Sequence, residues 1–218
     1  MDPNFWHERW QKKETGFHQP AVNDLLQLYW SRLGLEAGSK VFVPLCGRSL
    51  DMVWLADQGH RVIGAELSQI AIDEFFAECR LTPATSTNAS FNVKSAGPFE
   101  IWCGDFFDLP PSATAGVAGV YDRASLIAFP AAMQGRYAAK LKELAPPEAP
   151  LLLITLDYDQ KQMTGPPFAT PRSQVHSLFA DRYKIEELAC QSALEQSPRL
   201  MQRGLTSLEV CAYALRPI

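Results

Sequence analysis

One stretch of the chain constrains the fold more than any other, because it places a strand, a glycine turn, a helix start, a second strand and an acid in succession. Residues 40–45 are apolar and β-branched without a helical period, which is typical of a buried parallel strand. Gly47 permits a tight turn, and Ser49 can cap a helix that begins with apolar residues on one face. The second apolar run, residues 61–65, ends in Glu66. This order predicts a βαβ unit.

The acid at the end of the second strand indicates what such a unit would bind. In nucleotide-binding βαβ units a carboxylate at this place accepts from the ribose hydroxyls. The dinucleotide fingerprint G-x-G-x-x-G is missing, and no G-x-G occurs in the chain. Because a pyrophosphate needs a second close glycine, NAD and FAD are disfavoured. A nucleoside cofactor without phosphate fits better, and S-adenosylmethionine is the commonest of these.

Composition restricts the class of protein. The chain has 218 residues, 47% of them hydrophobic, and a net charge of −4. We therefore expect one domain over residues 1–218, with neither nucleic acid nor a membrane as partner. Five cysteines without a C-x-x-C pair predict free thiols in a reducing cytoplasm, and four histidines without ligand spacing predict no metal site. The N-terminus lacks the pattern of a signal peptide.

The rest of the chain alternates between strand and helix patterns, which predicts an α/β sheet. Residues 91–94 and 99–103 flank a Gly-Pro turn and are expected to pair as a hairpin, whereas residues 81–89 are predicted to be a polar loop. Helices are expected at 4–13, 21–33, 68–80, 131–145 and 173–180, and further strands at 116–121, 151–156, 183–189 and 205–215.

Several blocks of the sequence resemble the thiopurine S-methyltransferase family. They are colinear and cover nearly the whole chain. The blocks are Trp6-x-x-x-Trp10, Thr15-Gly-Phe-His-Gln19, Val43-Pro-Leu-Cys-Gly47, Val62-Ile-Gly-Ala-Glu-Leu-Ser68, Asp105-Phe-Phe-Asp-Leu-Pro110, Tyr121-Asp-Arg123 and Gly165-Pro-Pro-Phe168. The resemblance implies a class I methyltransferase (Rossmann-like) fold: a mostly parallel seven-stranded sheet with helices on both faces, and an N-terminal helical lid in residues 1–33. It also implies S-adenosylmethionine as methyl donor.

Five residues are candidates for the cofactor pocket. Glu66 is expected to bind the ribose, with a solvated surface acid as the alternative. Leu45 and Gly47 lie where such sheets bind ligands, although Leu45 can also serve packing alone. Asp105 and Phe106 are expected to contact the adenine, since an acid accepts from an exocyclic amine and an aromatic ring covers a base. The alternative for Asp105 is a helix cap.

The N-terminal segment carries three aromatic residues among polar ones. Trp6, Trp10 and Phe17 can form a satellite core cluster. They can also form a lid, because aromatic faces attract a sulfonium and exclude water from the methyl group. Under the lid interpretation Trp6 and Trp10 cover the cofactor and Phe17 contacts the acceptor.

Arginines are the candidates for the acceptor side. Arg123 follows Tyr121 and Asp122 at a predicted strand end, where it can meet acceptor and cofactor together. A structural ion pair with Asp122 is the alternative. Arg199 corresponds to a family arginine near the acceptor through a loosely matching block, and the choice between Arg199 and Arg203 stays open.

The resulting hypothesis is a cytoplasmic S-methyltransferase that acts on thiopurines or on other aromatic and heterocyclic thiols. The resemblance extends the acceptors to selenium and tellurium compounds. No general base is expected, because the sulfonium already activates the methyl group and heterocyclic thiols ionise easily. A monomer is the default. The alternatives are a nucleoside-binding module without turnover and, more remotely, a nicotinamide-dependent oxidoreductase.

Overall fold

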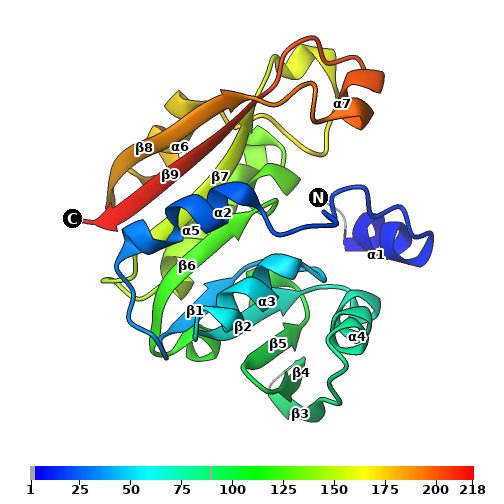
Figure 1. Cartoon of the computed structure of the whole chain (residues 1–218), viewed down its shortest axis with the longest axis vertical. Coiled ribbons are helices and arrows are strands. Elements are labelled where there is room, and N and C mark those ends of the chain that lie inside the picture. The colour runs from blue at the N-terminus through cyan, green and yellow to red at the C-terminus, as the bar shows by residue number, and fades with distance from the viewer. Residues whose placement is uncertain (1–2, 89) are drawn as a thin grey trace.

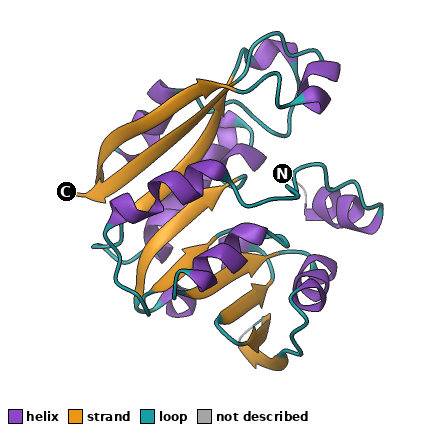
Figure 2. Ribbon diagram, in the orientation of Figure 1, coloured by secondary structure: helices purple, strands orange, loops and turns teal. Residues whose placement is uncertain are grey.

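The computed structural model describes residues 3–88 and 90–218, which form one nine-stranded sheet with helices packed on it (Figures 1 and 2). The strand order is β3-β4-β5-β2-β1-β6-β7-β9-β8. The strands are β1 (Lys40–Val43), β2 (Arg61–Glu66), β3 (Ala84–Asn88), β4 (Phe91–Ala96), β5 (Phe99–Cys103), β6 (Val117–Arg123), β7 (Leu151–Asp157), β8 (Tyr183–Ser192) and β9 (Glu209–Pro217).

The centre of the sheet is parallel and its edges are antiparallel. Strands β5, β2, β1, β6 and β7 pair in parallel, whereas β3, β4, β8 and β9 pair antiparallel with their neighbours. The predicted hairpin of β4 and β5 is confirmed. The sheet has nine strands and not the seven that the resemblance implies. One of them, β3, replaces most of the expected loop at 81–89; Ala89 itself lies outside the described residues. Every residue of β3 is exposed, so this edge strand carries no apolar pattern that could reveal it.

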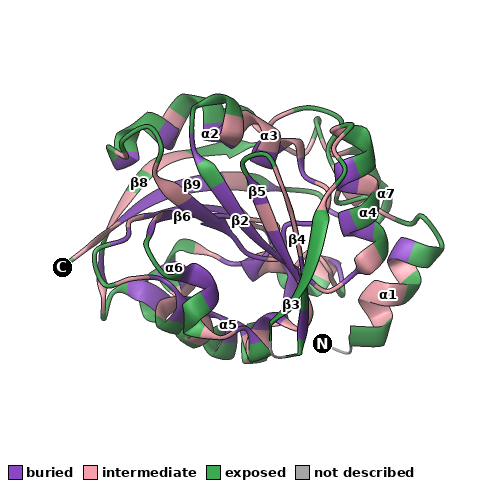
Figure 3. Cartoon of the chain, turned by 90° about the horizontal axis from the view of Figure 1, so that it is seen from below, coloured by how far each residue is buried: buried purple, intermediate pink, exposed green. Residues whose placement is uncertain are grey.

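Helices cover both faces of the sheet, as expected (Figure 3). Helices α2, α3 and α4 pack on one face around Phe75, Leu55 and Leu26, and α5 and α6 pack on the other around Tyr137 and Phe179. The helices are α1 (Pro3–Gln11), α2 (Asp24–Tyr29), α3 (Leu50–Asp57), α4 (Gln69–Glu78), α5 (Ala131–Leu144), α6 (Arg172–Phe179) and α7 (Pro198–Gln202). No helix in the described ranges is long and apolar enough to cross a membrane.

Side-chain caps fix where these helices begin. Ser49 caps α3 and Ser68 caps α4, as predicted. The helix expected over 21–33 is shorter, because the Asn23 side chain accepts from the amides of Leu25 and Leu26 and so starts α2 at Asp24. The last part of the expected helix, Trp30–Leu33, is a 3₁₀ turn.

The carboxyl ends of β1 and β6 form the topological switch point of the sheet, since the chain leaves β1 toward β2 on one side and reaches β6 on the other. Open α/β sheets bind ligands at this place. Two non-glycine residues adopt left-handed backbone here, Leu45 after β1 with φ of 46° and Ala124 after β6 with φ of 64°. Such backbone is costly and concentrates at functional sites.

The expectation that all five cysteines are free is wrong for one pair. Cys190 on β8 and Cys211 on β9 occupy directly opposed positions of the antiparallel ladder and form a disulfide. Cys46, Cys79 and Cys103 are free thiols. Sequence spacing alone did not reveal the pair, because the two cysteines meet only through the pairing of the final strands.

Candidate active site

A cleft of about 1740 Å³ runs along the switch point. It is bordered by the N-terminal segment, by the turns after β1 and β2, by the segment after β5, and by the end of β6. The far wall comes from the Gly165–Pro167 loop and the segment that contains α7. All predicted site residues line this cleft: Trp6, Trp10, Phe17, Leu45, Gly47, Glu66, Asp105, Phe106, Arg123 and Arg199.

Glu66 lies at the end of β2 with its carboxylate facing the turn after β1. Its Oε2 accepts from the Gly47 amide at 2.9 Å, and its Oε1 accepts from the Ser68 amide at 2.7 Å. The residue is only 7% exposed, so the alternative of a solvated surface acid is wrong. Burial raises the pKa of Glu66, while the two amides act in the opposite direction. Each oxygen keeps lone pairs for a further donor.

Asp105 and its neighbours form the next part of the wall. Asp105 Oδ1 accepts from the Phe107 amide at 2.9 Å, so the carboxylate caps the 3₁₀ turn Phe106–Asp108. Phe106 is buried and stacks on Tyr137, with ring centroids 4.9 Å apart. Phe107, which the sequence analysis did not single out, is less buried and also lines the cleft, with the Arg136 guanidinium over its ring.

The N-terminal aromatics form one cluster over the turn after β1. Phe17 makes edge-to-face contacts with Trp6 and Trp10, with centroids 5.6 Å and 5.5 Å apart. Trp10 is 3% exposed, and a side chain at Gly47 would meet its ring at 3.4 Å. Phe17 is 37% exposed and faces the cleft. The segment therefore packs as a cluster and borders the cleft at the same time.

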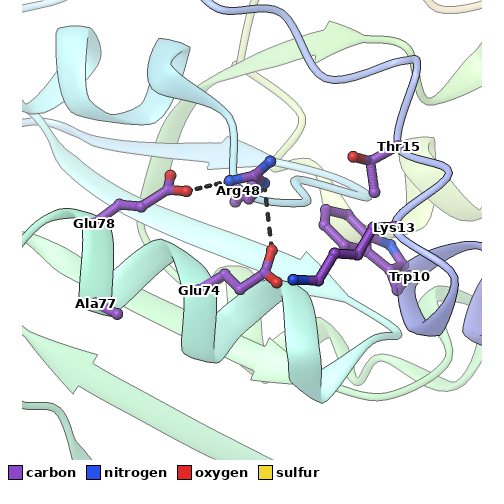
Figure 4. A pocket seen from close by; sticks show the side chains of 7 residues that line it. All are labelled: Trp10, Lys13, Thr15, Arg48, Glu74, Ala77 and Glu78. Atoms are coloured by element: carbon purple, nitrogen blue, oxygen red, sulfur yellow. Dashed lines mark hydrogen bonds and ion pairs between the residues drawn. The ribbon is translucent and has the colours of Figure 1, made fainter.

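A smaller pocket of about 360 Å³ lies behind Trp10, between the end of α1 and α4 (Figure 4). Arg48 pairs there with Glu74 at 3.4 Å and with Glu78. Figure 4 shows the Lys13 side chain directed toward Glu74 across this pocket. The two ion pairs of Arg48 therefore join the turn after β1 to α4, and Lys13 of the N-terminal segment lies beside them.

Arg123 projects from the end of β6 into a buried polar group. Its Nε donates to Asp51 Oδ2 at 2.5 Å, and its Nη2 donates to Ser49 Oγ at 2.9 Å. The suggested pair with Asp122 is wrong. Asp122 is fully buried and accepts from the Tyr137 hydroxyl at 2.7 Å. No sequence pattern indicates the Asp51 pairing, because an acid in the first turn of a helix is common.

Arg199 and Arg203 of the α7 region face different environments. Arg203 donates to the Pro166 carbonyl at 2.8 Å and so holds the Gly165–Pro167 loop. The Arg199 guanidinium lies against the backbone of Gly16, where an added side chain would come within 2.5 Å of Nη1. Among residues 3–88 and 90–218, no acid forms an ion pair with Arg199. Arg199 is thus the more available cation at the cleft.

Comparison with known proteins decides the family. The model of the thiopurine S-methyltransferase family matches residues 1–217. The chain belongs to this family. A thiopurine S-methyltransferase of Methylococcus capsulatus is 50% identical over 217 residues, covering 99% of this chain and 98% of the relative. One of Pseudomonas fluorescens is 45% identical over 218 residues and covers both chains completely.

Solved structures agree on the fold. A Burkholderia thailandensis 1,6-didemethyltoxoflavin-N1-methyltransferase superposes with a TM-score of 0.65 at 16% identity, covering 98% of this chain and 86% of that one. A methyltransferase of Anabaena variabilis that depends on S-adenosylmethionine gives 0.65 at 14% identity, with 99% and 95% covered. The chain therefore has the class I methyltransferase fold, and as a member of the thiopurine S-methyltransferase family it uses S-adenosylmethionine as methyl donor.

Proposed function

We propose that this methyltransferase transfers the methyl group to the sulfur of a heterocyclic thiol of the thiopurine type. The observation that carries the proposal is a cleft with a buried acid, Glu66, at one end and at the other a cation, Arg199, that has no acidic partner among the described residues. Pockets for one small ligand usually measure about 300–1000 Å³. The cleft is larger, so it has room for a cofactor and an acceptor together. The family name and the relatives support a sulfur acceptor.

The cofactor end suits a nucleoside. Glu66 is oriented by two amides and has acceptor capacity left for ribose hydroxyls. Leu45 and Gly47 both adopt left-handed backbone in the same turn, and both line this part of the cleft. Asp105 and Phe106 border the pocket on the side of β5. We assign these five residues to S-adenosylmethionine, with Trp6, Trp10 and Arg123 as further contacts.

The chain contributes alignment and exclusion of water. When bound, S-adenosylmethionine supplies a methyl group already activated by the positive sulfur. Phe17, Arg123 and Arg199 are placed to orient an electron-rich acceptor beside it, and the aromatic cluster shields that part of the cleft from solvent. Because an aromatic thiol ionises readily, no side chain needs to act as a strong general base.

The N-terminal segment is proposed to act as a lid. Trp10 packs on the turn after β1, while Phe17 and most of the neighbouring polar residues are exposed. Binding of S-adenosylhomocysteine should slow amide hydrogen exchange in residues 3–20 by about tenfold, with no matching change in the exposed edge strand β3. Equal exchange with and without ligand would leave a fixed aromatic cluster as the better description.

Methyl transfer itself tests the proposed function. The wild type is incubated with methyl-labelled S-adenosylmethionine and 6-mercaptopurine, and mass spectrometry identifies the product. We expect one S-methyl product for each S-adenosylhomocysteine released. Selenite and tellurite serve as further acceptors, because selenium and tellurium compounds are the wider acceptor class that we propose. Binding of S-adenosylhomocysteine without transfer to any acceptor would favour a nucleoside-binding module, and a thermal shift with NAD alone would favour an oxidoreductase.

We further propose that residues 1–218 act as one cytoplasmic domain and as a monomer that binds neither nucleic acid nor membranes. The net charge of −4 gives no electrostatic attraction to anionic surfaces. Light scattering after size exclusion should give the monomer mass of 24.3 kDa, and thermal unfolding should show one transition. A dimer at micromolar concentration, or two separate transitions, would contradict this proposal.

A further inference from the structure

Asp51 is a fully buried acid at the start of α3 that holds three separate parts of the fold. Its Oδ2 accepts from the Arg123 Nε at 2.5 Å and from the Tyr121 hydroxyl at 2.9 Å. Its Oδ1 accepts from the backbone amide of Asn23 at 2.9 Å. The residue has no solvent exposure, yet it lines the cleft. One carboxylate therefore joins α3, the end of β6 and the start of α2.

The contacts hold the Arg123 guanidinium in one orientation. Asp51 binds Nε, while Ser49, two residues earlier, accepts from Nη2 at 2.9 Å. Two acceptors on one edge of a planar fork fix both its place and its plane, which a single point contact does not achieve. Further N–H groups of the guanidinium remain for other partners. Arg123 is itself 12% exposed and borders the cleft, so a bound molecule can use them.

The third contact connects this orientation to the N-terminal segment. Asn23 belongs to the segment that lines the cleft over residues 15–25, and its side chain caps α2. Because the Asn23 amide donates to the same carboxylate that holds Arg123, the segment and the guanidinium share one anchor. Loss of the carboxylate would release both, and it would leave a desolvated cation without its partner.

We infer that Asp51 is a positioning residue for methyl transfer, which acts by fixing Arg123 at the acceptor side of the cleft. The inference rests on the proposed function. A purely structural ion pair makes a different prediction: its loss lowers stability and leaves turnover per folded molecule intact. Positioning instead predicts that the effect of Asp51 on turnover requires Arg123.

A double-mutant cycle separates the two. Asp51→Asn keeps the shape of the side chain and removes its charge. We expect it to lower kcat/KM for 6-mercaptopurine by about tenfold, with S-adenosylhomocysteine affinity changed less than about threefold. In an Arg123→Ala background the same change should alter kcat/KM by less than about twofold. Asp57→Asn, an exposed acid at the other end of α3, is the matched control and should leave all constants unchanged.

Ser49→Gly provides a second route if Asp51→Asn folds poorly. Glycine is tolerated at a helix N-cap with little loss of stability, but it removes the acceptor of Nη2. It should lower kcat/KM by about threefold, again only when Arg123 is present. Equal effects in both backgrounds, or full activity per folded molecule in both variants, would overturn the inference while wild-type transfer upholds the proposed function. A wild type that transfers no methyl group would refute the function itself.

Discussion

The two ends of the cleft differ in the groups that form them: backbone amides around a buried carboxylate at one end, and a side chain on a short surface helix at the other. At the end that we assign to the cofactor, backbone amides of Gly47 and Ser68 hold the buried carboxylate of Glu66, and both amides belong to turns that leave central strands. At the end that we assign to the acceptor, Arg199 lies on α7, a short helix without a buried residue. Beneath that helix lies a separate small cluster made of Tyr158, Met163, Leu205 and Leu208.

With the two ends assigned in this way, one fold can keep a cofactor and vary its acceptor. Backbone amides are fixed by the sheet and do not change when side chains do. A side chain on a surface helix can be exchanged at little cost to the core. The charges are also divided, because Glu66 has no cationic partner and Arg199 no acidic one within the described residues. Under the proposed assignment, an acid marks the nucleoside end and a cation marks the end for an electron-rich acceptor.

The largest expected effect is on folding stability, and it comes from Asp122, a buried acid of the scaffold that both ends share. Burial raises the pKa of Asp122 from 3.8 to about 6, against hydrogen bonds from Tyr137 and Leu126. The native state thus binds more protons than the unfolded state between these values. The stability from this group is fully present below pH 3.8 and is lost as the pH rises through about 6, at most about 3 kcal/mol.

Asp122→Asn removes this titration, so the wild type should lose stability relative to the variant as the pH rises from about 4 to about 7. Urea unfolding of both proteins across this range measures the difference. Asp57→Asn, at an exposed site, should give no such trend. A constant difference between wild type and Asp122→Asn would show that Asp122 does not change protonation on folding.

At the cofactor end the expected effect is nearly as large. A hydrogen bond to a charged group contributes about 1.5–3 kcal/mol. Glu66→Ala should therefore weaken S-adenosylhomocysteine binding roughly 10- to 100-fold in calorimetric titration. The exposed Glu36→Ala is the control. Unchanged affinity would remove Glu66 from the ribose site and erase the main distinction between the two ends.

Between the ends, Arg123→Lys should separate turnover from cofactor binding. Lysine keeps the charge but cannot contact Asp51 and Ser49 together, because it lacks the planar fork. Turnover with 6-mercaptopurine should fall about tenfold, by more than cofactor affinity falls, and the melting temperature should also decrease. Arg61→Lys, at an exposed site, controls for the substitution. Full specific activity would end the positioning role of Arg123.

The fold was predictable in its centre and less so at its edges. The strand, turn and helix around Gly47 follow from local pattern, and so do the caps at Ser49 and Ser68. The exposed strand β3 was missed, because its stability comes from hydrogen bonds to β4 and its sequence shows no apolar period. The helix before β1 was predicted too long at both ends. The predicted start at residue 21 lies before the true N-cap, Asn23, and the apolar period continues into the 3₁₀ turn Trp30–Leu33.

The site shows the same limit. Glu66 could be singled out from sequence order, because a βαβ unit fixes where its second strand ends. Asp51 and Phe107 could not, because their roles depend on which strands and turns meet in space. The Cys190–Cys211 pair likewise depends on the register of β8 and β9. Local pattern thus predicts contacts within a unit and misses those between distant units.

The smallest expected effect belongs to the acceptor end. Arg199 is exposed, so water and salt screen its charge. Arg199→Ala should raise KM for 6-mercaptopurine by about threefold while S-adenosylhomocysteine affinity stays within about twofold of the wild-type value. Steady-state rates at saturating S-adenosylmethionine and calorimetry measure the two constants. An unchanged KM would move acceptor binding away from α7.

A crossed comparison of these two variants tests the division of the cleft most directly. Cofactor affinity and acceptor KM are measured for wild type, Glu66→Ala and Arg199→Ala on matched preparations. The account predicts a crosswise pattern: Glu66→Ala weakens S-adenosylhomocysteine binding roughly 10- to 100-fold with little change in acceptor KM, and Arg199→Ala does the reverse on a smaller scale. If either variant changes both constants by the same factor, or if Glu66→Ala acts only on the acceptor, the two ends are not separate sites.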